Sequence, residues 1–287
     1  MIEIRQGLVL LLLCLISLNT HGWGATGHKI ACGIAYQLLE TQQQKTLDQI
    51  VVNYRTPDRR SFRFFSQTCV LADIARSKAR LGATKWKKFR RFENWHFLNV
   101  PRSVKQPGRK YCRGNCILTG IDYHQTKFKS STSGADKAEA LFFLGHWVAD
   151  AHQPMHISFA DDRGGNRIKV SAKLNMHSLW DSVVVDKLVG SAKWWIFAEQ
   201  LAKQISTQQR KKWEQSSPLE WTAESFAITI SPETKYCTVR STFFSTKCQP
   251  LANPKITEDD IQKFSVVAKE RLQQSGVRLA QILRQLL

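Results

Sequence analysis

The stretch "GHWVADAHQPMH" at residues 145–156 combines an apolar helix pattern with several side chains that can bind a metal ion. His146 and Asp150 are four positions apart, so they share one face of a helix. His152 follows Asp150 by two residues and points away from that face. The next proline ends the helix, which allows His156 to turn back toward it. The stretch therefore predicts a buried helix with one pair of metal ligands, followed by a turn that adds another ligand.

A second stretch with the same pattern, "MHSLWD", contains His177 and Asp181 at helical spacing. Imidazole nitrogen and carboxylate oxygen are the ligands that zinc takes at catalytic sites. A single pair of this kind is common on helix surfaces, but two pairs inside apolar helices indicate a metal site. Asp73 in "VLADIAR" and His96 in "ENWHFLNV" are further candidates. The alternative is that all of these residues form buried polar pairs without a metal ion.

The first 22 residues have the pattern of a secretory signal peptide. Arg5 precedes an unbroken apolar block from Leu8 to Leu18, which is shorter than the roughly 20 residues that a membrane helix needs. We therefore expect a secreted or periplasmic protein without stable membrane insertion, whose mature chain is one domain of residues 23–287. An uncleaved membrane anchor is the alternative.

Cleavage after residue 22 would create a metal ligand that the precursor lacks. Trp23 would then be the first residue, and its α-amine and carbonyl could chelate a metal ion. The pKa of an α-amine is roughly 7.7 to 8.0, so a metal ion displaces its proton at little cost near neutral pH. His28, about one helical turn further on, could supply a third ligand.

The charge of the chain favours anionic partners. The formal net charge is +19, which suits nucleic acid, anionic lipid headgroups or sulfated sugars. The densest basic segment, "KWKKFRR" at residues 85–91, alternates cations with aromatic rings. Cations can bind phosphates and rings can stack on bases. The alternative is a solvated basic face whose rings belong to the core.

The cysteines fit an oxidising compartment. The chain has seven cysteines, and an even number remains once Cys14 leaves with the signal peptide. Sequence alone leaves the pairing open. The spacing favours small loops and suggests these pairs: Cys112 with Cys116, Cys237 with Cys248, and Cys32 with Cys69.

Helical periodicity dominates the rest of the chain and predicts a mainly α single domain. The clearest expected helices are 29–39, 138–151, 177–188 and a final helix that starts after Thr257 with a cap and acidic residues. The best strand candidate is 166–170. Residues 99–124, rich in Pro, Gly and Cys, are expected to form a long disulfide-held loop.

Taken together, these motifs resemble the S1/P1 family of zinc-dependent single-strand nucleases. The resemblance covers nearly the whole mature chain and rests, in order, on "WGATGH", "LADIAR", "NWHFLNV", "LGHWVADAHQPMH", "RGGN" and "HSLWD". It implies a mostly helical domain with about three zinc ions in a cleft. It also implies endonucleolytic cleavage of single-stranded DNA and RNA to 5′-phosphate products, together with 3′-nucleotidase activity.

The resemblance also implies roles for individual residues. It assigns the first zinc ion to Asp73, His96, His146 and Asp150, the second to His156, His177 and Asp181, and the third to Trp23, His28 and the shared Asp150. Asp73 would in addition orient the attacking water, and Arg76 would neutralise charge on the phosphate. His124 has no role in this scheme, and His152 is expected to be structural.

A base pocket follows from the same resemblance. Phe97 would stack on a base and Asn166 would contact its edge, although Phe97 could instead belong to the core and Asn166 to a turn. Fungal members have aspartate at the position of Asn99, which leaves the base preference open. The basic segment at 85–91 lies in an insert relative to those members and would extend binding to duplexes.

Two other functions remain open on the sequence alone. A zinc-dependent phospholipase C shares this arrangement of ligands, but the basic charge favours nucleic acid over a zwitterionic lipid. A non-catalytic, cationic, zinc-stabilised binding protein is the second alternative, although the candidate ligands exceed the roughly four of a closed structural site. We expect a monomer.

Overall fold

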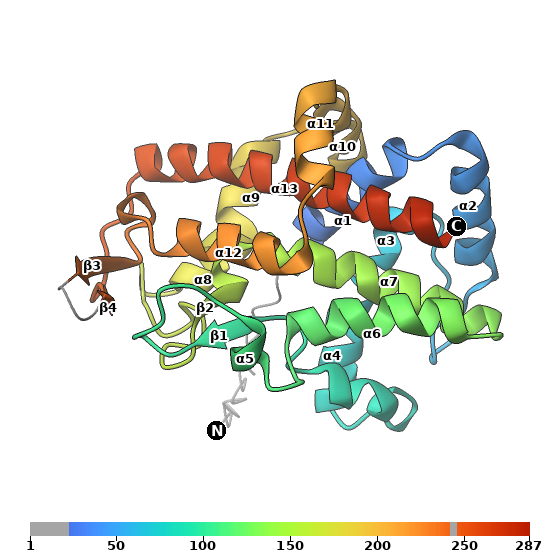
Figure 1. The fold of residues 1–287 in the computed structure, drawn as a ribbon, viewed down its shortest axis with the longest axis horizontal. Helices are drawn as coiled ribbons and strands as arrows, with labels where there is room; N and C mark the ends of the chain where they lie inside the picture. The colour runs from blue at the N-terminus through green and yellow to red at the C-terminus, as the bar shows by residue number, and fades with distance from the viewer. Residues whose placement is uncertain (1–22, 242–245) are drawn as a thin grey trace, which may run out of the picture.

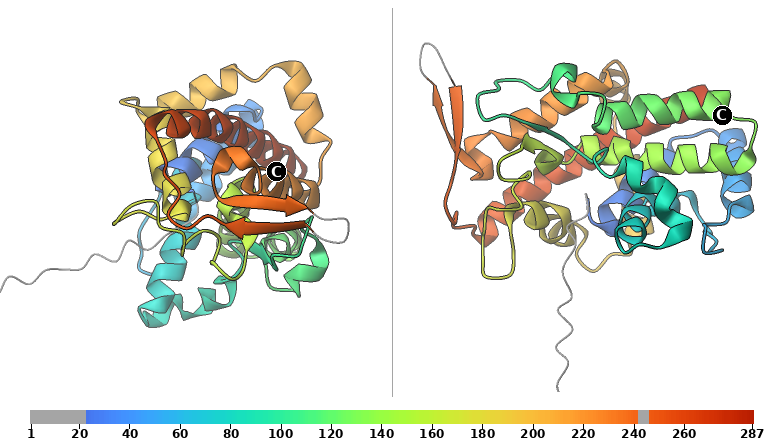
Figure 2. Two further views of the ribbon diagram at one scale, coloured as in Figure 1. Left: turned by 90° about the vertical axis from the view of Figure 1, so that its left-hand side faces the viewer. Right: turned by 90° about the horizontal axis from the view of Figure 1, so that it is seen from below.

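The computed structural model describes residues 23–241 and 246–287, so the predicted signal peptide lies outside the described residues. Helices dominate this part of the chain, as predicted (Figure 1). Figures 1 and 2 show a hairpin of strands β3 (Cys237–Ser241) and β4 (Thr246–Pro250) at one end of the molecule and helix α2 (Thr41–Asn53) at the other. No helix among the described residues is long and apolar enough to cross a membrane.

Helix α7 (Gly134–Ala151) forms the centre of the fold, and its residues from 140 to 151 are all buried. The side chain of Ser133 caps its first turn by accepting a hydrogen bond from the Asp136 amide. Helices α1 (Ala25–Gln37), α6 (Ile117–Ser130) and α13 (Glu258–Leu286) pack around it. The metal-ligand pattern of residues 146–150 therefore lies in the core.

The remaining elements are short and surround these four helices. The α-helices are α3 (Phe65–Thr68), α4 (Leu71–Arg80), α5 (Arg109–Cys112), α8 (Met176–Ser178), α9 (Val184–Val189), α10 (Trp194–Lys203), α11 (Thr207–Glu214) and α12 (Pro218–Thr229). The other helical turns are the 3-10 helices η1 (Thr84–Phe92), η2 (Pro154–His156) and η4 (Pro232–Thr234), and the π-helix η3 (Leu179–Val183).

Two short strands connect distant parts of the chain beside α7. Strand β1 (Leu98–Val100) pairs in parallel with β2 (Ile157–Phe159), with Leu98 opposite Ile157. The residues just before these strands, His96 and His156, are thereby brought together. A parallel pair of only three residues each contributes little stability by itself, so its main consequence is this juxtaposition.

The final helix and the disulfides follow the prediction. Helix α13 starts after Thr257, whose side chain accepts a hydrogen bond from the Asp260 amide. The structure contains the three expected disulfides: Cys32 with Cys69, Cys112 with Cys116, and Cys237 with Cys248.

Two local predictions are wrong. Residues 166–170 form no strand: the turn in which Arg163, Gly164 and Gly165 have positive φ continues to residue 167, and Lys169 makes only an isolated β-bridge to Asn175. Residues 99–124 are only partly a loop, since β1 extends to residue 100, α5 lies in this range and α6 begins at residue 117. The apolar face of α6 packs on α7, and this packing decides its helical state.

The basic segment at 85–91 forms η1, whose aromatic side chains Trp86, Phe89 and Phe92 are buried. The expectation that its rings stack on bases is therefore wrong, and the alternative with rings in the core is correct. The cations are exposed, and one of them, Lys88, lies 2.9 Å from Glu139 of α7.

The crossing of α1 and α13 predicts a sensitive position. A Cβ atom at Gly276 would lie 2.6 Å from the Ile34 Cβ and 3.2 Å from the Ala31 carbonyl oxygen. Gly276→Ala should therefore lower the free energy of unfolding by about 1–3 kcal/mol, measured by urea denaturation. Gly134→Ala is the control, because nothing lies within 4 Å of its added Cβ. Equal losses in both variants would contradict this account of the crossing.

Candidate metal centre and cleft

Asp150 lies at the centre of the candidate metal site, in the last turn of α7, and is fully buried. Its Oδ2 atom is 3.1 Å from His96 Nδ1 and 3.1 Å from His146 Nε2. Its Oδ1 atom is 3.3 Å from His28 Nε2 and 3.5 Å from His156 Nδ1. The two oxygens of one carboxylate thus face different sets of histidines, which is the arrangement that a shared ligand requires.

The first predicted ligand group comes together as expected in space. Asp73 in α4 has its Oδ1 atom 3.7 Å from His96 Nδ1 and 3.7 Å from His146 Nε2. His146 Nε2 and His96 Nδ1 are 3.0 Å apart. Two nitrogens this close without an intervening proton would repel, so a shared proton or a metal ion is needed between them.

The second predicted group, His156, His177 and Asp181, also converges. Its candidate ligand atoms lie within 4.8 Å of one another. His177 Nε2 is 3.4 Å from Asp181 Oδ2, so the predicted one-turn spacing holds although Asp181 lies in the π-helix η3. Single π turns of this kind often occur at functional sites.

Three of the histidines are oriented by backbone carbonyls. The Nδ1 atom of His146 lies 2.7 Å from the Cys69 oxygen, that of His156 lies 2.5 Å from the His96 oxygen, and that of His177 lies 2.6 Å from the Gly164 oxygen. Donation from Nδ1 assigns the proton to that nitrogen. The lone pair on Nε2 is then available to a metal ion, as in most metal-binding histidines.

Several buried polar atoms in this cluster form no well-aligned hydrogen bond, although His28 Nε2 lies 3.3 Å from Asp150 Oδ1 and His177 Nε2 lies 3.4 Å from Asp181 Oδ2. They are both ring nitrogens of His28, Asp150 Oδ1, His156 Nε2 and Asp181 Oδ2. A buried polar atom without a partner costs free energy, and such atoms are rare in folded proteins. Nitrogen and oxygen donors that point at a common space fit a divalent ion such as zinc.

The electrostatics of the cluster fit the same ion. Burial opposes protonation of His146, but the carboxylates of Asp150 and Asp73 outweigh it and raise the pKa of His146 to about 9. Burial lowers the pKa of His177 to about 3 and raises the pKa of Asp181 well above its usual value. A bound cation would favour the deprotonated form of all these ligands.

The predicted third group starts at the first described residue. The side chain of Trp23 is fully buried, and the Gly24 amide donates to the Asp181 carbonyl oxygen over 2.8 Å. This bond holds the Trp23–Gly24 segment beside the π-helix that carries Asp181. One turn further on, the ring of His28 stacks on that of His146 with centroids 3.8 Å apart.

An open cleft of about 620 Å³ lies above the cluster. His156 and His177 line it together with the predicted Arg76, Phe97, Asn99 and Asn166. Phe97 is only half-buried, so it is not a core residue. Asn99 Oδ1 is buried without a hydrogen-bond partner, whereas Asn166 donates to the Arg163 oxygen over 2.7 Å.

The sequence did not single out several residues that contact the site. Tyr111, Asn115 and Arg163 line the cleft, and Gln153 Nε2 lies 2.5 Å from Asp181 Oδ1. Arg163 and Gln153 belong to the motifs "RGGN" and "HQPMH", so their place in those motifs was the available signal. Nothing in the sequence pointed to Tyr111 or Asn115, because only the folding of the chain brings them to the cleft.

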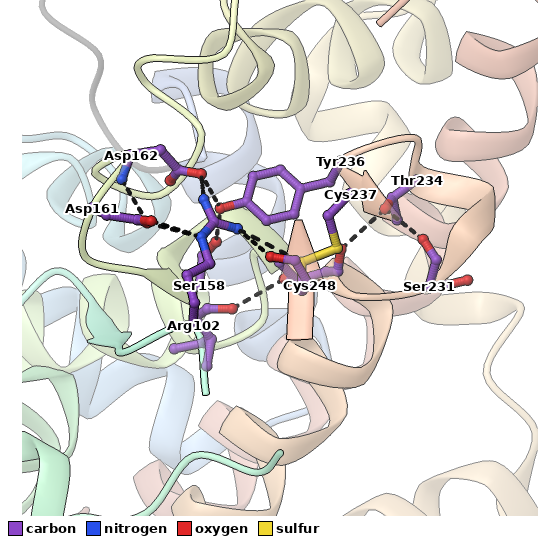
Figure 3. The surroundings of a disulfide bond; sticks show 11 residues. Arg102, Ser158, Asp161, Asp162, Ser231, Thr234, Tyr236, Cys237 and Cys248 are labelled. Atoms are coloured by element: carbon purple, nitrogen blue, oxygen red, sulfur yellow. Dashed lines mark hydrogen bonds and ion pairs between the residues drawn. A yellow bond between two sulfur atoms is a disulfide. The ribbon is translucent and has the colours of Figure 1, made fainter. Parts of the chain in front are cut away.

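Asp162 braces the glycine turn that holds His177. Its Oδ1 atom accepts a hydrogen bond from the Gly165 amide over 2.8 Å, and the Gly164 carbonyl is the acceptor for His177. Figure 3 shows the other side of this carboxylate, where Oδ2 meets the Arg102 guanidinium and the Tyr236 hydroxyl, the latter over 2.6 Å.

The same arginine connects this brace to the hairpin. Arg102 lies 4.3 Å from the Phe159 ring and donates to the Cys248 carbonyl, and Cys248 forms the disulfide that closes the β3–β4 hairpin (Figure 3). The hairpin is therefore connected to the metal centre through a short series of polar contacts, although it lies at one end of the molecule.

The two histidines without a predicted ligand role serve packing. His152 lies between the Val148 carbonyl and Arg278 of α13, at 2.7 Å from each. The ring of His124 stacks on Phe143, with centroids 5.3 Å apart. Neither belongs to a group of potential metal ligands in the described part of the chain.

A mostly helical domain whose buried histidines and aspartates converge below an open cleft has the arrangement that a metal-dependent hydrolase requires. The family described as "S1/P1 Nuclease" matches residues 23–287, and the chain belongs to this family. It is therefore a nuclease, an enzyme that hydrolyses phosphodiester bonds.

Curated relatives agree with this assignment. Endonuclease 2 of Arabidopsis thaliana is 31% identical over 68% of this chain and 69% of its own length. Endonuclease 4 of the same plant is 25% identical over 92% of this chain and 89% of its own. Nuclease P1 of Penicillium citrinum is 30% identical over 58% of this chain and 60% of its own.

The hydrogen bond from the Gly165 amide to Asp162 predicts that Asp162 affects metal affinity although it is not a ligand. Asp162→Ala removes the acceptor that holds the glycine turn, so His177 should lose its fixed orientation. Outer partners of this kind typically change metal affinity about tenfold or more, which a zinc titration of the metal-free protein would measure. Asp161→Ala is the matched control, because Asp161 is exposed and its carboxylate contacts the same Arg102 and the Asp162 amide, but neither Gly164 nor Gly165. Equal zinc affinity in the two variants would contradict the brace.

Proposed function

We propose that this chain is an exported zinc-dependent endonuclease that cleaves single-stranded DNA and RNA to 5′-phosphate products, with 3′-nucleotidase activity. The observation that supports this most is the convergence on Asp150 of histidines from three separate segments, α1, the residues before β1 and the stretch 145–156, below an open cleft. Membership in a nuclease family gives the reaction class.

We assign three zinc ions to these groups. The proposed ligands are Asp73, His96, His146 and Asp150 for one ion, His156, His177 and Asp181 for another, and Trp23, His28 and Asp150 for the third. The orphaned buried donor atoms and the separate orientations of the two Asp150 oxygens support this assignment. Zinc bound there would act as a Lewis acid on the phosphate and lower the pKa of water.

The side chains around the cluster would perform the remaining steps. Asp73 would orient the attacking water and accept a proton from it. Arg76 lies one turn further along α4, at the wall of the cleft, and its charge would stabilise the phosphate as negative charge develops. Its Nε has no hydrogen-bond partner, so it can donate to a bound phosphate.

We place one base of the substrate between Phe97, Asn99 and Asn166. Phe97 offers a half-buried ring for stacking, and the orphaned Asn99 Oδ1 offers an acceptor to a base edge. A base must leave the stack to enter such a pocket, which favours single strands. The exposed cations of the basic segment at 85–91 would bind additional phosphates, including those of a duplex.

Export and the N-terminus are part of the same proposal. The disulfides fit an oxidising compartment, secreted or periplasmic, and cleavage after residue 22 would free the Trp23 amine. The proposed mature enzyme is one domain, residues 23–287, and a monomer. A phospholipase C activity is not favoured, because the family match is to nucleases and the chain is strongly basic.

Metal analysis tests the shared ligand. Asp150→Ala removes a carboxylate that we assign to two ions, so the purified mature variant should retain about one zinc ion where the native enzyme has about three. Cleavage of single-stranded DNA by the variant should be slower by at least about a thousandfold. Neither the native enzyme nor the variant should hydrolyse phosphatidylcholine. Loss of only one ion would mean that Asp150 does not bridge.

The N-terminus supplies a separate test. One alanine added before Trp23 converts the amine into an amide, which is a poor ligand, so this variant should lose one zinc ion and most of its activity. His28→Ala should lose the same ion. The same alanine added after the C-terminal Leu287 is the control. Full activity of the N-terminally extended enzyme would show that the amine is not a ligand.

A further inference from the structure

We propose that a second groove, separate from the metal centre, binds an unpaired segment of the nucleic acid substrate; this inference rests on the proposed function. The groove has a volume of about 850 Å³, compared with about 620 Å³ for the cleft. Its walls come from α1, α2, α3 with the residues just before it, and the start of α10. Figure 1 labels these helices. It shares no lining residue with the cleft.

The exposed apolar side chains of the described chain concentrate at this groove. Val52, Phe64 and Trp195 line it and are 50%, 49% and 51% exposed. Ile196, next in the chain, is 44% exposed. Isolated exposed apolar residues need no explanation, but a contiguous group around a hollow is typical of a binding surface.

Each of three aromatic rings here has a cation over it. Lys29 Nζ lies 5.9 Å from the Trp194 ring centre, the Arg63 guanidinium 5.2 Å from the Phe64 ring, and Lys193 Nζ 5.3 Å from the Trp195 ring. None of the three cations forms an ion pair with another described residue. Their charges are thus available to an anionic ligand.

The lining contains one acidic residue, Asp48, and one basic residue, Arg63. Asp48 accepts a hydrogen bond from the Tyr36 hydroxyl over 2.8 Å. The groove therefore presents flat rings, and Lys29 and Lys193, which lie over two of these rings but outside the lining, give the site a surplus of positive charge. Sites for single strands combine these two features, because the cations meet phosphates and the rings stack on bases that no partner strand covers. A duplex, whose bases are covered, fits such a groove poorly.

The groove and the metal centre lie on different sides of α1. His28 faces Asp150, whereas Gly33, five residues further along the helix, lines the groove. Five residues correspond to about 140° around a helix axis, so a ligand in the groove cannot touch the metal centre through α1. A long strand could occupy both places, and attachment at one would raise its effective concentration at the other. A dinucleotide could occupy only the cleft.

The dependence of KM on the length of the substrate tests this proposal. The double variant Phe64→Ala/Trp195→Ala should raise KM for an oligothymidylate of about 30 nucleotides roughly tenfold, since each stacked base contributes measurably to binding. Its kcat, and its kinetics on a thymidine dinucleotide, should equal those of the native enzyme. Leu81→Ala is the matched control, because Leu81 is 80% exposed but lies outside the groove. An unchanged KM for the long strand would overturn the proposal.

A binding measurement separates this inference from the proposed function. In protein treated with a chelator, the same oligothymidylate should quench tryptophan fluorescence, and Arg63→Gln/Lys193→Gln should reduce the salt dependence of binding. Native protein that cleaves no nucleic acid yet shows this quenching would refute the proposed function and support the groove. Absent quenching, or a native dimer that dissociates in the double variant, would overturn the groove as a nucleic acid site.

Discussion

The structure depends on one buried carboxylate. Asp150 is fully buried, and a buried charge is strongly destabilising unless opposite charge and hydrogen-bond donors surround it. His28, His96, His146 and His156 supply this environment from three separate segments. Burial alone would raise the pKa of Asp150, but His146, His156 and His28 hold it well below its usual value. The segments that meet at Asp150 are thereby held at the distances that a metal cluster needs.

The rest of the core keeps these segments in place. The disulfide between Cys32 and Cys69 connects α1 to the start of α4 and packs directly on α7. A Cβ atom at Gly145 would lie only 2.6 Å from the Cys69 sulfur, so a glycine is required beside His146. The same contact region supplies the Cys69 carbonyl that orients His146. Covalent linkage, close packing and ligand orientation therefore act at one place in the fold.

The sequence alone determined the features that depend on neighbours within one helical turn. The spacing of His146 and Asp150, and of His177 and Asp181, predicted two ligand pairs that the structure indeed brings close together. The cap at Thr257 correctly placed the start of α13. Such features follow from local geometry, because residues three or four apart on a helix are neighbours whatever the rest of the chain does. Motif order then indicated the family, which the comparison confirmed.

Only the tertiary structure decided the features that depend on distant residues. The pairing of β1 with β2 joins segments about 60 residues apart and brings His96 to His156, and no local pattern encodes that register. The rings of the basic segment are buried because they pack on α7, where the Phe89 ring stacks on that of Phe143. No pattern in the sequence around residue 89 indicates this contact. The brace at Asp162 and the groove beside Trp195 likewise arise where separate elements meet. Periodicity shows that a helix has an apolar face, but the packing of the whole chain decides what covers that face and what stays open.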